Sequence, residues 1–392
     1  MKKLISKTED FIQRIRWKAF FFINPPKPNP DREKINTFGF RTKKNAPQIP
    51  ELVPFENDLS NLIANLEFDD HKTGFQKSLD RDIRAIKRSP NVFIKADKTH
   101  NIYEVNKNKY HELMTNNITA EYKKTTGETL DQINSEANVI TTKLKINDRV
   151  EKIAMKDAFI TLKDHKPQFP NDITCRLINP TKSNIGKISK QLLDTINMTI
   201  MQKLNLKLLK NSAETIDWFK TIEFKPRRRF IQFDLVNYYP SVSKKLFDEV
   251  LQFAMNETNG LIDDDQMQIF SNARKSILCY NEDIWTKKTG QFDITMGAFD
   301  GAQVTDLVGL YILYLLKRDI PEIDFALYRD DGIGVHRRFS HSEMDRIRKR
   351  LFKLFNDLGL KITVDTNLSK IDFLDITMDL SNETHQPYKK TK

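Results

Sequence analysis

The most informative segment is Phe325-Ala326-Leu327-Tyr328-Arg329-Asp330-Asp331-Gly332-Ile333-Gly334-Val335, in which two apolar runs flank two adjacent carboxylates. The runs predict two β-strands joined by a tight turn that holds both carboxylates. Asp-Gly suits a two-residue hairpin loop, which explains Asp331 and Gly332 but not Asp330. Like charges about 4 Å apart repel by about 4 kcal/mol at an effective dielectric constant of 20. In a cleft the pair therefore needs a cation, and carboxylate oxygens suit Mg²⁺.

A third carboxylate ends another apolar run, Phe230-Ile231-Gln232-Phe233-Asp234-Leu235, which predicts a strand that reaches solvent at Asp234. Taken alone, each segment has an ordinary explanation, because Asp is frequent in turns and at helix N-termini. Together, in this order along the chain, the two segments predict one carboxylate site that binds metal.

These segments resemble two motifs of reverse transcriptases. Tyr328-Arg329-Asp330-Asp331 resembles their Tyr-x-Asp-Asp box, and Phe233-Asp234-Leu235-Val236-Asn237-Tyr238-Tyr239 resembles their first palm motif. The resemblance implies an α+β fold with the fingers and palm of a right-hand polymerase, in which helices cover an antiparallel sheet. It also implies a mostly helical N-terminal region.

The resemblance implies a site of two divalent ions, Mg²⁺ with Mn²⁺ as an alternative. Asp234 and Asp330 match the metal ligands of the family, and Asp331 matches a supporting carboxylate. The backbone carbonyl of Leu235 matches a further ligand. Tyr239 matches an aromatic side chain that presses on the ribose 2′-hydroxyl, although a core tyrosine is the alternative.

Other matches follow the order that the family requires. The predicted hairpin from Leu162 to Ile178 resembles the fingers, where Lys163 and Arg176 would grip the incoming triphosphate. The segment 293–303 resembles a glycine-containing loop that supports the nucleotide, and only Gly297 carries over from it. Residues 373–375, Phe373-Leu374-Asp375, resemble the last palm motif, so Phe373 and Leu374 are expected to touch the primer.

Three short motifs point to Penelope-like retroelement enzymes within this superfamily: Lys95-Ala96-Asp97-Lys98, Lys163-Asp164-His165-Lys166 and Phe373-Leu374-Asp375. The resemblance extends from about residue 90 to the end. The sequence stops before a full thumb, which leaves open whether it is a fragment of a longer product.

Composition adds weaker constraints. The chain has 392 residues and a net charge of +11, which favours a polyanionic partner. Two cysteines exclude a disulfide framework. No segment has the roughly 18 uninterrupted apolar residues of a membrane span, and no signal peptide is evident, so we expect an intracellular protein of the nucleus or cytoplasm.

Two basic runs flank the carboxylate segments in the sequence. Arg227-Arg228-Arg229 precedes Asp234, and Arg337-Arg338 follows Asp331. On both sides of a carboxylate cluster, such runs would suit a nucleic-acid backbone held across a palm. Solvated loops are the alternative.

We expect five regions: a basic flexible arm (1–50), a helical N-terminal region (51–150), fingers (151–229), a palm (230–380), and the start of a thumb or a tail (381–392). The expected activity is RNA-directed DNA polymerisation, with an RNA template, a DNA primer and deoxynucleoside triphosphates as partners. Two alternatives stay open: an RNA-dependent RNA polymerase, against which Tyr239 argues, and an incomplete or domesticated palm-fold protein that binds nucleic acid without turnover.

Overall fold

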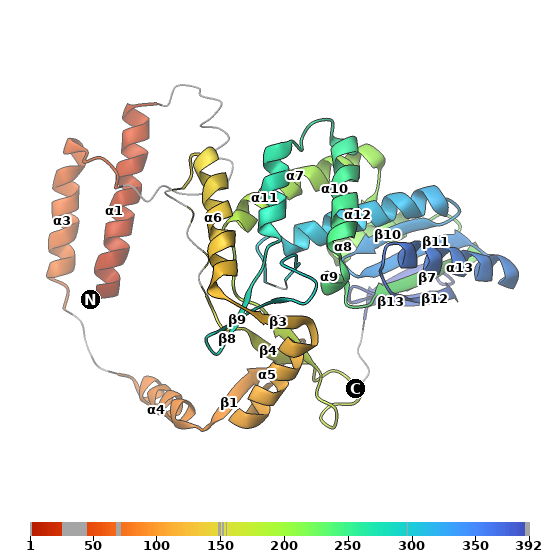
Figure 1. Ribbon diagram of the computed structural model, residues 1–392, viewed down its shortest axis with the longest axis horizontal. Helices are drawn as coiled ribbons and strands as arrows, with labels where there is room; N and C mark the ends of the chain where they lie inside the picture. Colours follow the sequence, from red (N-terminus) through yellow and green to blue (C-terminus); the bar gives the residue numbers. More distant parts are fainter. Residues whose placement is uncertain are drawn as a thin grey trace. The chain divides into compact units, whose positions relative to one another are not determined.

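The computed structural model describes residues 2–25, 45–67, 72–147, 150, 153, 155–295 and 297–388. The chain divides into two compact units, one of residues 1–112 with 141–150 and the other of residues 113–140 with 151–392. Figure 1 labels many of the helices and strands of both units.

The first unit is mostly helical, as expected for the N-terminal region. Its elements are α1 (Lys2–Ile23), the 3₁₀ helix η1 (Pro50–Leu52), α3 (Val53–Ala64), α4 (Gly74–Arg88), the strands β1 (Asn91–Lys95) and β2 (Ile102–Asn106), and the start of α5 (Lys107–Glu121). β1 and β2 form an antiparallel hairpin.

Within the expected basic flexible arm, residues 1–50, Lys2–Ile23 form helix α1. Proline cannot continue a helix interior, but Pro25 follows α1 and does not interrupt it. Within α1, the Trp17 ring stacks on Phe21 with centroids 5.5 Å apart. Arg16 also forms an ion pair with Glu56 of α3. The proline-rich remainder of the expected arm, residues 26–44, lies outside the described residues.

The second unit contains the remaining elements in the following order. They are the end of α5, β3 (Tyr122–Thr125), α6 (Gly127–Lys143), β4 (Phe159–Leu162), β5 (Cys175–Ile178), α7 (Ile185–Leu204), β6 (Lys207–Leu208), α8 (Ser212–Thr221), η2 (Lys225–Arg227), β7 (Arg228–Leu235), α9 (Tyr238–Ser241), α10 (Lys244–Thr258), α11 (Asp264–Ala273), β8 (Leu278–Tyr280), β9 (Asp283–Lys287), α12 (Gly301–Asp319), β10 (Asp324–Tyr328), β11 (Asp331–Arg337), α13 (His341–Asp357), β12 (Ile362–Leu368), β13 (Lys370–Phe373), β14 (Ile376–Asp379) and β15 (Thr384–Pro387).

The central sheet has the strand order β12-β7-β11-β10-β6. β12, β7, β11 and β10 pair antiparallel, whereas the short β6 pairs parallel with β10. β6 lies in the segment expected to be fingers, so the boundary expected at residue 230 separates one strand from its own sheet.

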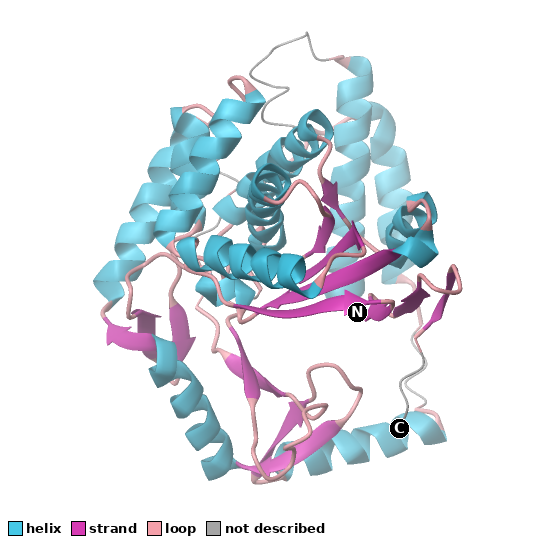
Figure 2. Ribbon diagram, turned by 90° about the vertical axis from the view of Figure 1, so that its right-hand side faces the viewer, coloured by secondary structure: helices cyan, strands magenta, loops and turns pink. Residues whose placement is uncertain are grey.

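Strand alternation gives this sheet two different faces. Ile231, Phe233 and Leu235 of β7 point into a large core shared with α7, α10, α12 and α13. Phe230 points to the other face, into a smaller core that includes residues of α8, β13 and β14. Helices α7, α10, α12 and α13 therefore pack on one face of the sheet, and α8 packs with β13 and β14 on the other, so the fold is the expected α+β type, whose helices and strands Figure 2 shows in separate colours.

Smaller sheets complete the unit: β3-β9-β8, β4-β5 and β13-β14-β15. The segment expected to be a thumb or tail thus contributes β15, and residues 389–392 lie outside the described residues. Among the described residues, no helix combines the length and the apolar character that a membrane crossing requires.

Candidate functional site

The strand pairing brings the carboxylate segments together at one end of the central sheet. Asp331, the first residue of β11, lies directly opposite Asp234 of β7. Directly opposite residues share a face, so both carboxylates are on the face that carries Phe230 and Ile333 further along the strands. The Leu235 N–H donates to the Asp330 carbonyl at 2.9 Å, which joins the third carboxylate residue to the same place.

The two-residue hairpin loop lies two positions earlier than the Asp331-Gly332 loop that the sequence suggested. Tyr328 pairs with Asp331, so Arg329 and Asp330 are the two turn residues and Asp331 and Gly332 belong to β11. Arg329 takes the positive φ of +53° there. As a result Asp330 lies in the turn and Asp331 in the strand, and the two adjacent carboxylates have different backbone surroundings.

The donor set suits Mg²⁺ chemically, because carboxylate oxygens on neighbouring strands are hard ligands. Asp234 is exposed and Asp330 and Asp331 are half-buried, so solvent and ions reach the side chains. In the part of the chain that the structure describes, no three His, Cys, Asp or Glu side chains are gathered closely enough to enclose an ion. The match of these three carboxylates to Mg²⁺ therefore rests on the residue types and on the strand register.

The two adjacent tyrosines after β7 have different environments. Tyr238 is 3% exposed, and its hydroxyl donates to the Thr305 carbonyl at 2.8 Å. Burial raises the pKa of Tyr238 well above its usual value. Tyr239 is half-buried beside the start of α12, where a Cβ at Gly301 would lie 3.7 Å from its Cε1. Of the pair, only Tyr239 has a side chain that a ligand could reach.

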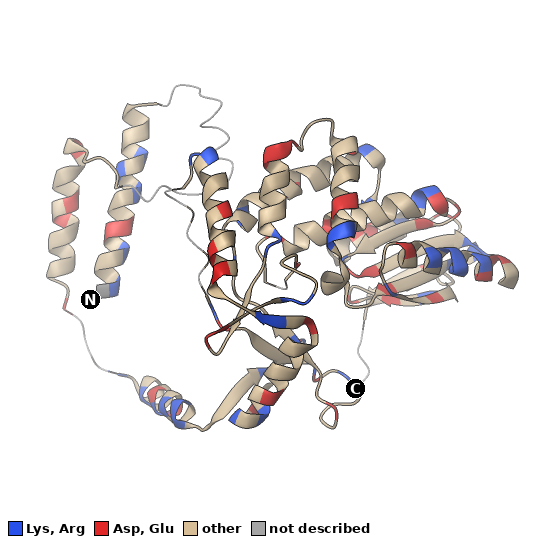
Figure 3. Ribbon diagram, viewed as in Figure 1, with Lys and Arg blue, Asp and Glu red and all other residues tan. Residues whose placement is uncertain are grey.

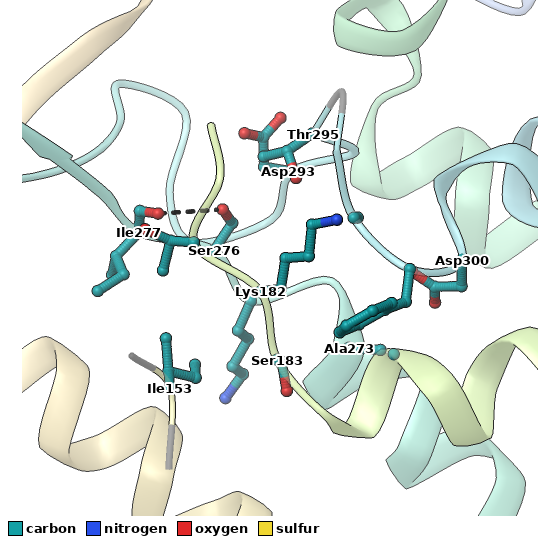
Figure 4. A pocket seen from close by; sticks show the side chains of 14 residues that line it. Ile153, Lys182, Ser183, Ala273, Ser276, Ile277, Asp293, Thr295 and Asp300 are labelled. Atoms are coloured by element: carbon teal, nitrogen blue, oxygen red, sulfur yellow. Dashed lines mark hydrogen bonds between the residues drawn. The ribbon is translucent and has the colours of Figure 1, made fainter. Parts of the chain in front are cut away.

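The loop that carries Gly297 is held at both ends by buried carboxylates. Asp293 accepts a hydrogen bond from Tyr122 at 2.7 Å and pairs with Lys287 at 2.8 Å. Asp300 pairs with Arg274, and each side chain of that pair is 1% exposed. Figure 4 shows Asp293 and Asp300 at the small pocket of about 20 Å³ beside this loop.

Gly297 itself is required by geometry. Its φ is +117°, and a Cβ there would lie 2.8 Å from the Asn179 carbonyl oxygen. Asn179 is anchored in turn, because its side-chain amide donates to the Ile277 carbonyl at 2.7 Å. The loop therefore passes very close to the segment that follows β5.

Lys163 and Arg176 lie on the β4–β5 hairpin. Arg176 is opposite Thr161, and the Lys163 N–H continues the ladder to the Thr174 carbonyl at 3.0 Å. Because alternate residues of a strand share a face, Lys163 and Arg176 are diagonal neighbours on one side of the hairpin. The hairpin belongs to a separate two-stranded sheet from the one that bears the carboxylates.

The basic runs lie together and not on two sides of the carboxylates, which corrects that interpretation. Arg337 is opposite Arg228, and Arg229 is opposite His336. This end of the strands is six residues from Asp234, or roughly 20 Å at about 3.3 Å per residue. Arg338 follows this strand end, and Arg227 precedes it in η2. Nearby α13 adds further cations, visible as blue segments in Figure 3: Arg346, Arg348, Lys349, Arg350 and Lys353.

The residues expected to touch a primer differ in exposure. Phe373 is 3% exposed, and its side chain packs in the smaller core. Leu374 is half-buried at the β13–β14 turn, with a φ of +49°. Its carbonyl accepts a hydrogen bond from Ser212 at 2.7 Å.

Two ion pairs near the site were missed from the sequence. Arg329 pairs with Asp306 of α12, and Arg274 pairs with Asp300. Burial raises the pKa of Asp306 to about 6, although the Arg329 charge opposes the shift. Neither pair had a signal in the sequence, because the partners are 23 and 26 residues apart along the chain.

The sequence matches no protein-family model and no curated protein. The structure is similar to telomerase from Candida albicans in complex with a fragment of telomeric RNA, with a TM-score of 0.53, 10% identity and coverage of 79% of this chain and 55% of that chain. It is similar to apo telomerase from Candida tropicalis, with a TM-score of 0.52, 10% identity and coverage of 90% and 65%.

At a lower TM-score of 0.44, the structure is similar to the RNA-dependent RNA polymerase of a human picorbirnavirus, with 10% identity and coverage of 91% of this chain and 75% of that chain. The chain spans 55% to 65% of the length of the two telomerase chains. The two telomerase likenesses show that this chain has the right-hand polymerase fold.

Proposed function

We propose that the chain is an RNA-directed DNA polymerase that extends a DNA primer on an RNA template. The observation that carries the proposal is the register of Asp234 with Asp331 beside the Asp330 turn, within a right-hand polymerase fold. Telomerase, which has the similar fold, is itself a reverse transcriptase.

The reaction is a nucleotidyl transfer. The primer 3′-oxygen attacks the α-phosphorus of a deoxynucleoside triphosphate, gives its proton to water, and forms the new P–O bond as the bond from the α-phosphorus to the bridging oxygen breaks and pyrophosphate leaves. Asp234, Asp330, Asp331 and the Leu235 carbonyl would hold two Mg²⁺ or Mn²⁺ ions. When bound, such ions activate the attacking oxygen and stabilise the leaving group.

Other residues have proposed roles in binding. Lys163 and Arg176 share one side of a hairpin and would bind the triphosphate, for which the planar guanidinium is suited. Tyr239 would lie against the sugar, and the loop at Gly297 would support the nucleotide.

The proposed contacts with the template and primer are further from the chemistry. Arg227, Arg228, Arg229, Arg337 and Arg338 would contact the phosphate backbone from the far end of the sheet, and Leu374 would contact the primer. This division fits a duplex that extends away from the carboxylates, because backbone contacts give affinity without chemistry.

We further propose that the protein derives from a Penelope-like retroelement. The three motifs quoted above support this origin, and Lys163 and Leu374 belong to two of them.

A primer-extension assay on the purified full chain tests the proposal. An RNA template, a DNA primer and Mg²⁺ or Mn²⁺ should support deoxynucleotide incorporation, and Asp330→Asn should abolish it while hybrid affinity changes by no more than a few-fold. Asp324→Asn is the matched control, because Asp324 begins β10, the strand that leads to the Asp330 turn, and pairs with Lys207 there. It should retain activity.

The alternatives have distinct outcomes. Preferential ribonucleotide incorporation by the unmodified protein would identify an RNA-dependent RNA polymerase. Tight binding of the RNA–DNA hybrid with no incorporation of either nucleotide would identify a palm-fold nucleic-acid-binding protein without turnover.

A further inference from the structure

The turn that carries Asp330 has a backbone that needs external support. Arg329 takes a φ of +53°, in the left-handed region that disfavours residues with a Cβ. Such a conformation persists where surrounding contacts fix it. The contacts of the Arg329 side chain are therefore informative about how the turn is held.

Arg329 reaches from the turn to helix α12. Its Nη1 donates to the Ala302 carbonyl at 2.7 Å and to the Asp306 carboxylate. Ala302 and Asp306 are four residues apart, so they lie on the same face of the helix, one turn from each other. A single guanidinium thus spans the β10–β11 turn and the first turns of α12.

The same part of α12 also contacts the segment that follows Asp234. Tyr238, which comes soon after β7, donates its hydroxyl hydrogen bond to Thr305, the neighbour of Asp306. The two segments that bear the carboxylates are therefore both attached to residues 302–306 of one helix.

Both members of the ion pair are enclosed enough for the contact to matter. The side chains of Arg329 and Asp306 are 30% and 23% exposed. Salt screens such partly buried pairs less than exposed ones. The pair of Lys207 with Asp324, at the other end of β10, is more exposed, at 36% and 52%.

We propose that Arg329 and Asp306 are a positioning pair, which tethers the Arg329–Asp330 turn to α12 and thereby fixes the Asp330 carboxylate relative to Asp234. This inference rests on the proposed function. Neither residue is assigned a contact with substrate, so both act through the placement of Asp330.

The first test is single-nucleotide incorporation by Arg329→Ala and Asp306→Ala. We expect the rate constant to fall by about ten- to a hundredfold, because small misplacements of reacting groups have effects of this size. The KM for the nucleotide and the affinity for the hybrid should stay within about threefold, since a positioning pair acts on the chemical step through Asp330. The Asp306→Arg, Arg329→Asp double variant should recover part of the rate.

The second test does not depend on activity. Hydrogen exchange followed by mass spectrometry should show faster exchange in peptides covering residues 328–332 of Arg329→Ala, with exchange in β13 and β14 unchanged. Asp324→Asn, which removes the control pair on the same strand, should leave both sets of peptides unchanged.

The outcomes separate the tether from the proposed function. Unchanged exchange at residues 328–332 in both alanine variants overturns the tether, whether or not the protein incorporates nucleotides. Faster exchange confined to residues 328–332 in the alanine variants supports the tether. If the unmodified protein also incorporates no nucleotide, the polymerase proposal is contradicted while the tether is supported. Accelerated exchange throughout the unit would mean that the pair supports general folding, and would also overturn the specific role.

Discussion

Gly332 of β11 lies against the ring of Phe233 on β7, its directly opposite neighbour. A Cβ at Gly332 would lie 2.0 Å from the Phe233 Cζ, closer than any real contact. Phe233 is in turn 1% exposed in the large core, with its ring 5.2 Å from that of Phe355. The glycine after the paired carboxylates is therefore set by packing on the opposite face of the strand.

Gly332→Ala should consequently destabilise the protein. The Phe233 ring is enclosed and cannot move away cheaply, and overpacking of this kind costs roughly 1–3 kcal/mol or more. A lower midpoint of thermal or denaturant unfolding would show the effect. The control is Gly127→Ala at the start of α6, where a Cβ would meet nothing within 4 Å. An equal loss in both variants would contradict the packing explanation.

This contact also explains one limit of the sequence analysis. The apolar runs around residues 230–235 and 325–335 were sufficient to predict the strands, because alternation and composition are local signals. Asp-Gly was a reasonable local choice for the turn, but Gly332 is needed under Phe233, so the turn falls at Arg329 and Asp330. The observed register thus places Gly332 opposite a ring from a strand that is distant in sequence.

The pairing of strands that are far apart along the chain could not be predicted from the sequence for the same reason. β3 and β9 pair through residues such as Tyr122 and Lys287, which are far apart along the chain. Nothing in either segment encodes its partner. By contrast, the capping box at the start of α13 joins Ser340 to Glu343, which are three residues apart, so this signal is local in the sequence.

Nucleotide binding by the hairpin is testable at Arg176. Arg176→Lys keeps the charge and removes the planar fork that binds phosphate through two hydrogen bonds. We expect slower incorporation and a higher nucleotide KM, with unchanged affinity for primer and template, in single-turnover and binding measurements.

Arg318→Lys is the control for this substitution, because Arg318 pairs with Asp319 at the far end of α12. It should leave both measurements unchanged. Weaker template binding with normal nucleotide kinetics in Arg176→Lys would instead make the hairpin a template clamp.

The raised pKa of Asp306 gives the folding free energy a specific pH dependence. Burial is the main cause of the shift to about 6, and the Asp194 charge adds to it, whereas Arg329 and Lys210 oppose it. Between the unfolded pKa near 4 and the folded pKa near 6, the folded protein holds a proton that the unfolded chain has released. The contribution of Asp306 to stability is therefore greatest below pH 4 and is lost as the pH rises through 6.

Asp306→Asn lacks this titration. The free energy of unfolding of the unmodified protein, minus that of Asp306→Asn, should fall by roughly 1–3 kcal/mol from pH 5 to pH 7.5. Denaturant unfolding without divalent ions measures the difference. A difference that grows with pH would mean that the Arg329 charge outweighs burial. A stability contribution that falls as Asp306 ionises agrees with a pair that fixes the position of the turn. Enclosed ion pairs often add little net stability, because desolvation offsets their attraction.

Sugar selection is the remaining test, and it decides between the two polymerase alternatives. Tyr239 follows the strand that bears Asp234 and is half-buried beside Gly301 at the start of α12. A nucleotide held at Asp234 would have its sugar near this ring, which leaves no space for a 2′-hydroxyl. Because the exclusion is steric, Tyr239→Ala or Tyr239→Val should admit ribonucleotides with a smaller loss for deoxynucleotides.

Tyr238→Phe is the matched control on the neighbouring residue. It removes the hydrogen bond to the buried Thr305 carbonyl, so it should lower stability by about 1–3 kcal/mol and leave sugar preference unchanged. Single-nucleotide incorporation of matched ribo- and deoxynucleotides measures the preference, and each tenfold change corresponds to about 1.4 kcal/mol. Because Tyr238 is 3% exposed, a preference controlled by Tyr238 would require the turn after β7 to rearrange when nucleotide binds. Unchanged preference in both Tyr239 variants would remove the steric role of Tyr239.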